Sequence, residues 1–453
     1  MEESLINISP IDGRYRDLTE DVRSCFSEYH LIKNRIVIEI KWLEMMSEIP
    51  EIDFYLSNDE LVVLEKIIEK FDLNEGKRVK EIESTTKHDV KAVEYYIDDC
   101  LKENGLERCI PYVHFLCTSE DINNLAYGLM EKTLLEEVYI KNVQGLIDIL
   151  VSKANEYSNV PMLSHTHGQP ATPTTVGKEL ANFAYRMNKV LNRIKVEKFA
   201  GKFNGTVGNY NAHFLAYPNV NWLDVSKKFV EMLGLEFNPY TTQIEPHDNL
   251  SIIFSEIKLL NNILLDFNND MWMYISRNYF SQENVAGEIG SSVMPHKINP
   301  INFENSMANC KMSNGIIDVF TDNLQISRMQ RDLSDSSLLR NIGSVFAYCI
   351  IAIKQTIRGI KRVSPNESIL KGELDNNPEI LAEAVQTILR KNGYNNAYDI
   401  LKEMTRGKEV SLDEIRNFIN NLNIDVNDKN KLMELVPENY TGLADKLANE
   451  LSK

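Results

Sequence analysis

The sequence lacks the features that mark membrane, secreted and disulfide-stabilised proteins. Its longest apolar run, "VFAYCIIAI" at 345–353, is far shorter than the ~20 residues that a membrane-spanning helix requires. The N-terminus, "MEESLINISP", is acidic and has no apolar core of a signal peptide. The six cysteines include no CxxC pair, so we expect free thiols in a reducing compartment. These absences predict a soluble, cytoplasmic protein.

The sequence also has no excess of positive charge. Proteins that bind nucleic acid or membrane surfaces need a basic surface for that binding. The formal net charge is −17 at pH 7, so we expect neither kind of partner. A small anionic ligand is still compatible with this charge, because it responds to the local field of a cleft. The sequence contains no G-x-S-x-G, H-E-x-x-H, EF-hand or P-loop motif. Hydrolase, metal and nucleoside-triphosphate chemistry therefore have no support.

Helical periodicity, by contrast, is abundant. Between residues 252 and 275, apolar residues recur at alternating spacings of four and three, which places them on one face of a long helix. These residues are Ile253, Ile257, Leu260, Leu264, Phe267 and Met271. Ile252, Leu259, Ile263 and Trp272 add apolar surface beside that face. Proline-free stretches permit long helices at 174–198, 248–277 and 303–362. We predict an all-α fold with a central bundle of long helices, and association between copies of the chain.

Helix breakers divide the sequence into three segments. We predict a mostly helical N-terminal domain over 1–111 and a central long-helix bundle over 112–364, with a loop near 281–300. A small helical domain follows over 365–453. Within it, Asn377-Pro378 is typical of a helix start, and "SLDE" at 411–414 is typical of a capping box.

Two stretches contain histidines with polar neighbours. In "SHTHGQPATP" (164–173), glycine and proline favour an irregular backbone, and either His165 or His167 could act as an acid or base. In "STTKHDVKAVEYY" (84–96), Lys87, His88 and Asp89 are consecutive. They fan out on a helix, but at a helix start capped by Thr85 or Thr86 they could converge on one ligand. Asp89 could then hold an imidazole in one tautomer. The alternative is a solvated helix start.

A third stretch, "HFLCTSEDINN" (114–124), predicts a helix start. Thr118 or Ser119 would cap the helix through Asp121, and helix N-termini attract anions. The alternative interpretation is a capped helix with no ligand.

A fourth stretch, "SRMQRDLSDSSLLRN" (327–341), suits a phosphate. Arg331 and Arg340 can each donate paired, charge-assisted hydrogen bonds to phosphate oxygens, and Ser336 adds a hydroxyl. Surface ion pairs with Asp332 and Asp335 are the alternative.

A fifth stretch, "GSSVMPHKINP" (290–300), combines a cation, an amide and two hydroxyls between glycine and proline. Lys297 and Asn299 match a carboxylate, and Ser291 and Ser292 offer hydroxyls. Glycines within and before the stretch permit it to move as a lid.

Together these stretches resemble the adenylosuccinate lyases of the bacterial type, a branch of the fumarase/aspartase superfamily. "GSSVMPHKINP" resembles the signature loop of the whole superfamily. The branch is indicated by "SPIDGRY" (9–15), "KHDV", "TSED", "THGQPATP" and "QRDLSDSSLLRN". The motifs extend from residue 9 to residue 341, and no motif was matched in 366–453.

The resemblance implies a three-segment all-α fold that forms a homotetramer with a multi-helix core and active sites shared between subunits. It implies β-elimination of fumarate from adenylosuccinate to give AMP. It also implies the same cleavage of succinylaminoimidazole carboxamide ribotide (SAICAR) to AICAR in purine nucleotide synthesis. No metal or organic cofactor is implied, and the substrates are small nucleotides.

By match to these motifs, the resemblance implies Ser291 as the base and His167 as the acid. His88 and Lys297 are also implied as catalytic, and His88 is the second candidate for proton donor. The implied substrate-binding residues are Arg14, Tyr15, Lys87, His88, Asp89, Thr118, Ser119, Gln243, Ser292, Lys297, Ile298, Asn299, Asn305, Arg331, Ser336, Ser337, Leu338, Leu339 and Arg340. Two alternatives stand beside this interpretation. One is another superfamily lyase, such as argininosuccinate lyase or fumarase, and the other is a catalytically silent helical scaffold.

Overall fold

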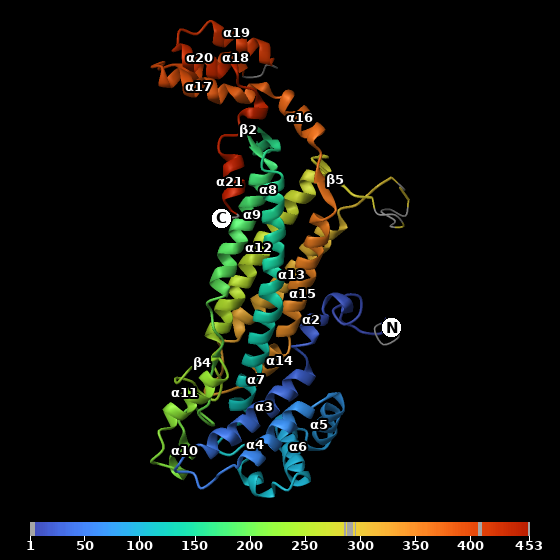
Figure 1. Ribbon diagram of the computed structural model, residues 1–453, viewed down its shortest axis with the longest axis vertical. Coiled ribbons are helices and arrows are strands. Elements are labelled where there is room, and N and C mark those ends of the chain that lie inside the picture. Colours follow the sequence, from blue (N-terminus) through green and yellow to red (C-terminus); the bar gives the residue numbers. More distant parts are fainter. Residues whose placement is uncertain (1–4, 285–286, 288–292, 295, 406–409, 452–453) are drawn as a thin grey trace. The chain divides into compact units, whose positions relative to one another are not determined.

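The computed structural model describes residues 5–284, 287, 293–294, 296–405 and 410–451, and the chain divides into two compact units. Unit 1 comprises Met1–Val143, Val190–Asn262 and Ala308–Lys354, and unit 2 comprises Gln144–Lys189, Ile263–Met307 and Gln355–Lys453. Helices make up most of both units (Figure 1), so the predicted all-α class is confirmed. The strands are short and form two-stranded sheets among the described residues.

Unit 1 centres on helix α3 (Glu28–Ser47), which packs against α4, α5, α6 and α7. Its buried residues lie around much of its circumference, as expected of a helix enclosed by several neighbours. The other elements wholly in unit 1 are η1 (Arg16–Leu18), α2 (Glu20–Arg23), α4 (Asn58–Lys70), α5 (Leu73–Thr86), α6 (Asp89–Glu103), η2 (Glu107–Tyr112), α7 (Ser119–Thr133), the π-helical turn η3 (Leu134–Tyr139), β3 (Ala200–Gly201), α10 (Asn211–Ala216), α11 (Trp222–Met232), β4 (Glu236–Phe237) and α14 (Ser334–Leu339). Strands β3 and β4 pair in parallel.

Five long helices of the described chain contribute residues to both units. They are α8 (Ile140–Glu156), α9 (Val176–Ile194), α12 (Asp248–Ser276), α13 (Ile301–Asn323) and α15 (Ile342–Ile360). Helices α9 and α12 match the spans predicted at 174–198 and 248–277. The proline-free span 303–362 is not one helix, because α13 ends at Asn323 and α15 begins only at Ile342. Between them the Asp332 carboxylate accepts hydrogen bonds from the backbone N–H groups of Arg328 and Ser334. Such local bonds compete with helix formation.

Helix α12 carries two apolar faces. The six residues predicted to form one face are each at most 2% exposed, so this prediction is confirmed. Of the four residues predicted beside that face, Ile252, Leu259 and Trp272 are 48%, 42% and 42% exposed, whereas Ile263 is buried, at 5%. One apolar stripe of α12 is therefore buried within the chain, and a second lies on its surface.

Unit 2 contains a β-hairpin, a small sheet and the C-terminal helices. Strands β1 (Pro161–Thr166) and β2 (Gln169–Thr175) pair in antiparallel fashion, as do β5 (Phe280–Gln282) and β6 (Val363–Pro365). The remaining elements are α16 (Glu367–Asp375), η4 (Pro378–Leu381), α17 (Ala382–Lys391), α18 (Ala397–Thr405), α19 (Leu412–Asn420), α20 (Val426–Met433), η5 (Pro437–Asn439) and α21 (Ala444–Glu450).

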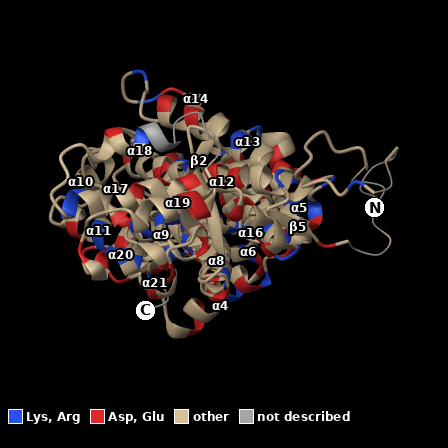
Figure 2. Cartoon of the chain, turned by 90° about the horizontal axis from the view of Figure 1, so that it is seen from above, with Lys and Arg blue, Asp and Glu red and all other residues tan. Residues whose placement is uncertain are grey.

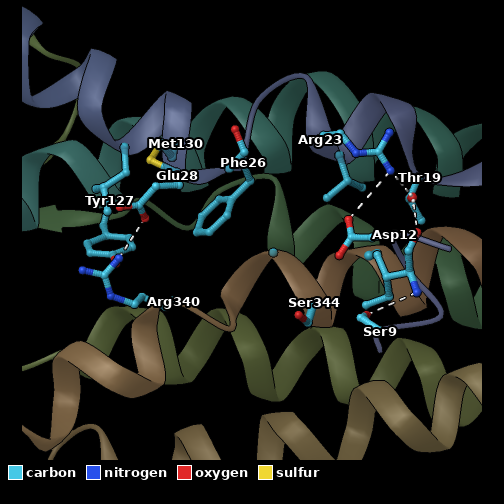
Figure 3. A pocket seen from close by; sticks show the side chains of 16 residues that line it. Ser9, Asp12, Thr19, Arg23, Phe26, Glu28, Tyr127, Met130, Arg340 and Ser344 are labelled. Carbon is cyan, nitrogen blue, oxygen red and sulfur yellow. Dashed lines mark hydrogen bonds and ion pairs between the residues drawn. The ribbon is translucent and has the colours of Figure 1, made fainter. Parts of the chain in front are cut away.

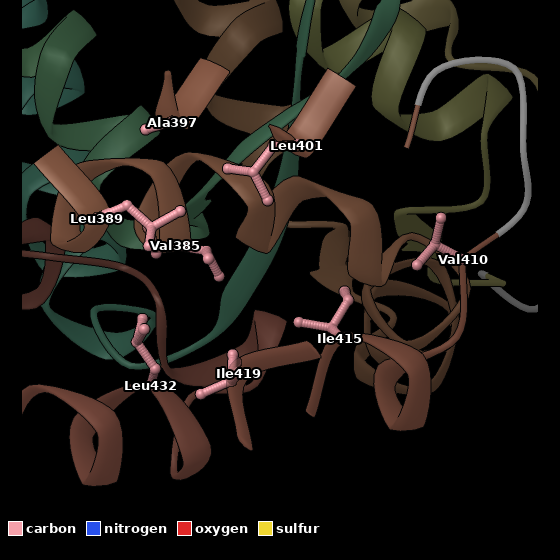
Figure 4. Packing of buried hydrophobic residues seen from close by; sticks show 9 residues of the cluster. Val385, Leu389, Ala397, Leu401, Val410, Ile415, Ile419 and Leu432 are labelled. Carbon is pink, nitrogen blue, oxygen red and sulfur yellow. The ribbon is translucent and has the colours of Figure 1, made fainter. Parts of the chain in front are cut away.

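The C-terminal helices enclose a core of their own (Figure 4). Val385 and Leu389 of α17 pack with residues of α18, α19 and α20, among them Ile415 and Leu432. The predicted helix starts in this region are confirmed. Ser411 forms a capping box at the start of α19, and Asn377-Pro378 begins η4.

The cysteines and the most apolar helix can be compared with the expectations from composition. None of the six cysteines forms a disulfide, and all lie in the described part of the chain. Within that part, Ser334–Ile360 is the one stretch with the length and hydropathy of a membrane span, and 67% of its apolar window is buried inside the chain. A core helix passes the same test. Basic and acidic residues are interspersed along the helices (Figure 2).

Glu131 on α7 is a buried carboxyl group that makes stability depend on pH. Burial, and then the charge of Glu245, raise the pKa of Glu131 from its ordinary value of 4.5 to about 8. The folded chain therefore keeps a proton that the unfolded chain releases above pH 4.5. Stability contributed by this group is complete below pH 4.5 and is lost as pH rises toward 8. Between pH 5 and pH 7 the loss is about 2 kcal/mol.

We expect Glu131→Gln, which is neutral at every pH, to remove that part of the pH dependence. Urea unfolding at pH 5 and pH 7 measures it, at one fixed protein concentration. Glu137→Gln is the control, because the Glu137 side chain is 60% exposed and ion-paired with Lys141 on the same continuous helix. An unchanged difference between the two pH values in Glu131→Gln would contradict the assignment.

Candidate active site

The start of helix α7 is built as predicted. Thr118 is the N-cap, and the Asp121 carboxylate accepts a hydrogen bond from the Thr118 backbone N–H at 2.8 Å. The side chains of Thr118 and Ser119 are partly exposed, while Glu120 and Asp121 behind them are buried. Two hydroxyls therefore stand at a helix N-terminus, where the partial positive charge favours an anion.

A buried ion pair fastens a loop to this helix start. The Lys202 ammonium lies 2.8 Å from Asp121 Oδ1, and both side chains are 0% exposed. The same carboxylate accepts hydrogen bonds from the backbone N–H groups of Asn204 and Gly205, at 3.0 and 3.1 Å. Lys202 also donates to the Gly205 carbonyl at 3.1 Å. The ion pair thus fixes the 202–205 loop against α7.

Arg331 is held by three segments of unit 1. Its guanidinium forms an ion pair with Glu120 and donates to Gln243 Oε1 at 3.3 Å and to Ser336 Oγ at 3.0 Å. Burial raises the pKa of Glu120, and the charge of Arg331 opposes that shift. The structure thus brings together Arg331, Gln243 and Ser336, three of the residues predicted to bind substrate. Glu120 is an additional member that the sequence interpretation missed, although it directly follows Ser119.

Arg340 lies at the end of α14 and bridges two carboxylates. It donates to Glu28 at 2.8 Å and to Asp89 at 3.2 Å, and Asp89 also accepts from Arg35 at 2.7 Å. Burial favours the protonated acid, but Arg35 and Arg340 hold the pKa of Asp89 below its ordinary value. The Arg340 side chain is 44% exposed, so a ligand can reach it.

Arg340 lines a cavity of about 420 Å³ in unit 1. Its walls come from the segment at 9–12, from α2 and the start of α3, from α7 and from α15. Figure 3 shows the ion pair of Arg340 with Glu28 on one side and that of Arg23 with Asp12 on the other. Arg14, which is exposed, and Tyr15 follow directly after the wall segment. The cavity therefore adjoins two predicted substrate-binding stretches.

The stretch 87–89 differs from its predicted geometry. Thr85 and Thr86 are the last residues of α5, and His88 itself is the N-cap of α6, with Nδ1 accepting from the Lys91 N–H at 3.1 Å. The prediction of a threonine cap is therefore wrong. Asp89 does not hydrogen-bond the His88 ring, since His88 Nδ1 and Asp89 Oδ1 are 4.0 Å apart. Asp89 bonds the two guanidiniums instead, because charged donors bind a carboxylate more strongly.

Of the remaining predicted residues of unit 1, three lie on α14 and two precede α6. Ser337 is exposed, Leu338 is partly exposed and Leu339 is buried. Lys87 and His88 are exposed, next to Asp89.

In unit 2, His167 stands at the tip of the β1–β2 hairpin. His167 and Gly168 have φ angles of +54° and +74°, which tight hairpin turns require. The irregular backbone predicted for this stretch is confirmed at the tip. Beside the tip the strands pair, with His165 opposite Pro170, and their register shifts between Met162 and Ser164. His167 is exposed, and its ring has no hydrogen-bonding partner among the residues described.

His165 has a different environment. Arg277 Nη1 lies 2.8 Å from His165 Nε2. Since a guanidinium only donates, Nε2 is the acceptor. Burial, and then the charge of Arg277, lower the pKa of His165. His165 is therefore a neutral imidazole whose accepting nitrogen is already occupied.

The hairpin is anchored by the C-terminal segment. Leu163 of β1 packs with Leu374, Ile380 and Leu381. Thr172 of β2 donates to Glu383 at 2.8 Å. Residues 366–453, in which no motif was matched, thus support the strand pair that presents His167.

The signature stretch is partly described. Ser291 and Ser292 lie outside the described residues. Lys297 and Ile298 are exposed, and the Ile298 carbonyl accepts from Gln282 at 2.8 Å. The remaining two predicted residues, Asn299 and Asn305, are partly exposed, before and within the start of α13.

These groups suit a substrate with several negative charges. Within unit 1 they are guanidiniums, hydroxyls and a helix N-terminus. Within unit 2 the exposed imidazole of His167 and the exposed Lys297 are the corresponding groups. In the described ranges, no three His, Cys, Asp or Glu side chains are grouped as metal ligands.

Sequence comparison identifies relatives over nearly the whole chain. A family model described as "Lyase" matches residues 13–314, and one described as "Adenylosuccinate lyase C-terminal" matches 327–441. The chain is 48% identical to adenylosuccinate lyase of Buchnera aphidicola subsp. Schizaphis graminum over 99% of both chains. It is 45% identical to adenylosuccinate lyase of Escherichia coli K12, again over 99% of both.

Structure comparison supports the fold. A fumarate lyase from Mesorhizobium sp. BNC1 matches with a TM-score of 0.75 at 17% identity, covering 95% of this chain and 97% of that one. A 3-carboxy-cis,cis-muconate lactonizing enzyme from Pseudomonas putida matches with a TM-score of 0.73 at 18% identity, over 95% of both chains. On the strength of the full-length sequence matches and both family models, the chain belongs to the adenylosuccinate lyase family.

Proposed function

We propose that the chain cleaves adenylosuccinate to AMP and fumarate, and SAICAR to AICAR and fumarate, in purine nucleotide synthesis. The observation that carries this proposal is the grouping of Arg331, Gln243 and Ser336 next to the start of α7. The paired N–H groups of a guanidinium can bind a phosphate, and the neighbouring helix N-terminus can bind a carboxylate of the same ligand.

The reaction begins with removal of a weakly acidic proton beside a carboxylate. The resulting dianion needs cations and N–H donors aimed at the developing charge. In the proposal Ser291 is the base, and Lys297 and Asn299 hold the carboxylate with help from Ser292, Thr118 and Ser119. A serine alkoxide requires a closed, cationic environment, which supports a role for Lys297 beside it.

The departing nitrogen needs an acid. In the proposal His167 supplies it, since its exposed ring stands at a hairpin tip while the accepting nitrogen of His165 is bonded to Arg277. His88 remains the second candidate. Its Nδ1 accepts a backbone hydrogen bond, which leaves Nε2 to carry a proton toward a ligand.

The nucleotide end is assigned to the guanidinium groups. Arg331, Ser336 and Arg340 hold phosphate, with Arg14 and Tyr15 adjoining the same cavity, and the backbone of 337–339 lies between them. Glu120 keeps Arg331 in place, because departure of the guanidinium would leave a buried carboxylate without its cation. Lys87 and Asp89 complete the proposed pocket beside His88.

We further propose a cytoplasmic homotetramer that shares its active sites between subunits, and a division of the chain at 111 and 364. The second apolar stripe of α12 supports association, since Ile252, Leu259 and Trp272 are more than 40% exposed. Met312 on α13 is 51% exposed and is a further exposed apolar side chain on a long helix. Apolar stripes along long helices are typical of interfaces between copies.

Fumarate release from adenylosuccinate, followed by its ultraviolet absorbance, tests the proposed activity. Inorganic phosphate should inhibit competitively, since it occupies the nucleotide end. We expect Arg331→Lys to raise both the KM and the inhibition constant of phosphate about tenfold, because lysine keeps the charge near Glu120 but lacks the planar fork.

Arg328→Lys is the matched control, because the Arg328 side chain is 85% exposed and pairs with Asp332. A chain that releases fumarate from argininosuccinate, or forms it from malate, without inhibition by phosphate would favour another lyase of the superfamily. No turnover of any of these substrates would favour a silent scaffold.

A further inference from the structure

The segment between η2 and α7 has a strained backbone. His114 and Leu116 have φ angles of +57° and +67°, in the left-handed region that side-chain-bearing residues seldom adopt. Two such residues within three positions persist only where the surroundings determine the conformation, and they concentrate at functional sites. The segment leads directly into Thr118 and Ser119.

Helix α3 holds this segment from one side. The Glu39 carboxylate, which is 0% exposed, accepts from the His114 backbone N–H at 3.1 Å and from His114 Nδ1 at 2.6 Å. One turn further along α3, Trp42 Nε1 donates to the Phe115 carbonyl at 2.8 Å. Three hydrogen bonds from two residues on one face of α3 therefore fix the strained backbone.

The electrostatic surroundings favour an imidazolium at His114. Glu39 of α3 bonds Nδ1, and Glu94 of α6 places Oε1 4.0 Å from Nε2. Lys91 bonds Glu94 on its far side, and Asp121 of α7 adds a further negative charge. Burial opposes the charge on the ring, but the carboxylates outweigh it and raise the pKa of His114.

We propose that His114 and Glu39 form a positioning pair that aims Thr118 and Ser119 at a carboxylate of the substrate. The assignment rests on the proposed function of that helix start. His114 does not touch the ligand. It acts by holding the backbone that enters α7, and the anchoring of Asp121 to Lys202 secures the helix from the other side.

If His114 and Glu39 position the start of α7, loss of the pair should weaken binding of the carboxylate end of the substrate more than binding of its phosphate end. In His114→Leu we expect the inhibition constant of fumarate, which reports the carboxylate end, to rise about tenfold. The inhibition constant of inorganic phosphate, which reports Arg331 and Arg340, should change less than about twofold. A merely structural role would move both constants together.

Charge and hydrogen bonding can be separated with His114→Gln, whose amide can still donate to Glu39. We expect the logarithm of the fumarate inhibition constant in His114→Gln to lie at least halfway back from the value in His114→Leu to that of the unchanged chain. In the unchanged chain the imidazolium is present at low pH and is lost as pH rises through its raised pKa, so fumarate binding should weaken above pH 6.5. That weakening should be absent from His114→Gln.

His30→Gln is the matched control, since His30 lies on the same helix α3 and bonds the Ser27 hydroxyl. It should preserve both inhibition constants and the pH dependence. If His114→Leu does not fold, His114→Gln carries the test through its pH profile. Equal changes in both constants, or an unchanged pH profile in His114→Gln, would overturn the positioning pair while the unchanged chain still releases fumarate. No fumarate release by the unchanged chain would overturn the proposed function, and this assignment with it.

Discussion

Replacement of Lys202 by methionine is expected to lower the free energy of unfolding by about 3–5 kcal/mol. Lys202 and Asp121 are both 0% exposed and lie 2.8 Å apart. Removal of the lysine leaves a buried carboxylate whose remaining partners are backbone N–H groups of Thr118, Asn204 and Gly205. A buried charge without its counter-ion costs far more than the loss of a surface pair.

Urea unfolding followed by circular dichroism measures this effect at a fixed protein concentration. Lys141→Met is the control, because the side chains of Lys141 and Glu137 are 63% and 60% exposed and their pair should contribute little. Adding Asp121→Asn to Lys202→Met should restore part of the loss, since the buried charge is then gone. A loss in Lys202→Met no larger than in Lys141→Met would mean that the charge of Asp121 is not stabilised by Lys202.

The long helices were predictable because their signal is local. The face of α12 from Ile253 to Met271 follows from spacing alone, and every member is buried. The interruption after Asn323 was not visible from proline. Within it, Asp332 accepts hydrogen bonds from nearby backbone groups, which no helix-breaking residue indicates. Absence of a helix breaker permits a helix but does not require one.

The hairpin at 161–175 was missed for a related reason. Glycine and two prolines in "THGQPATP" favour an irregular backbone, and the residues with positive φ angles, His167 and Gly168, lie within this stretch. The strands beside it lack regular alternation of apolar and polar residues. Their pairing is supported by Leu374, Ile380 and Glu383, which lie some 200 residues away in the sequence.

The candidate site shows the same division between local and distant information. Capping of α7 by Thr118 was predictable from the "TSED" motif. The ion-pair partners of the charged residues in the candidate site were not predictable. Glu120 pairs with Arg331, and Asp89 pairs with Arg35, across segments that come together only in the folded chain. The sequence indicates which residues carry charge, and the three-dimensional structure determines which charges neutralise one another.

Ser291→Ala is expected to lower kcat by about 10²–10⁴-fold, the range associated with loss of a positioned general base. In the proposed reaction the serine oxygen removes the proton beside the carboxylate, and alanine offers no atom that can accept it. The substrate should still bind, because phosphate and carboxylate are held by other residues. We therefore expect the dissociation constant of adenylosuccinate, measured by calorimetry, to change less than about threefold.

Ser281→Ala is the matched control, since Ser281 is an exposed serine on strand β5 of the same unit. It should retain full turnover, so that a loss confined to Ser291→Ala is a loss of chemistry. Binding without turnover would also separate the base from the residues that hold the substrate, because loss of a carboxylate-binding group weakens affinity as well. Turnover above about a tenth of the unchanged rate in Ser291→Ala would exclude the serine as base. The proton would then have to go to another group, and His88, which stands at a helix start within unit 1, would be the first to replace.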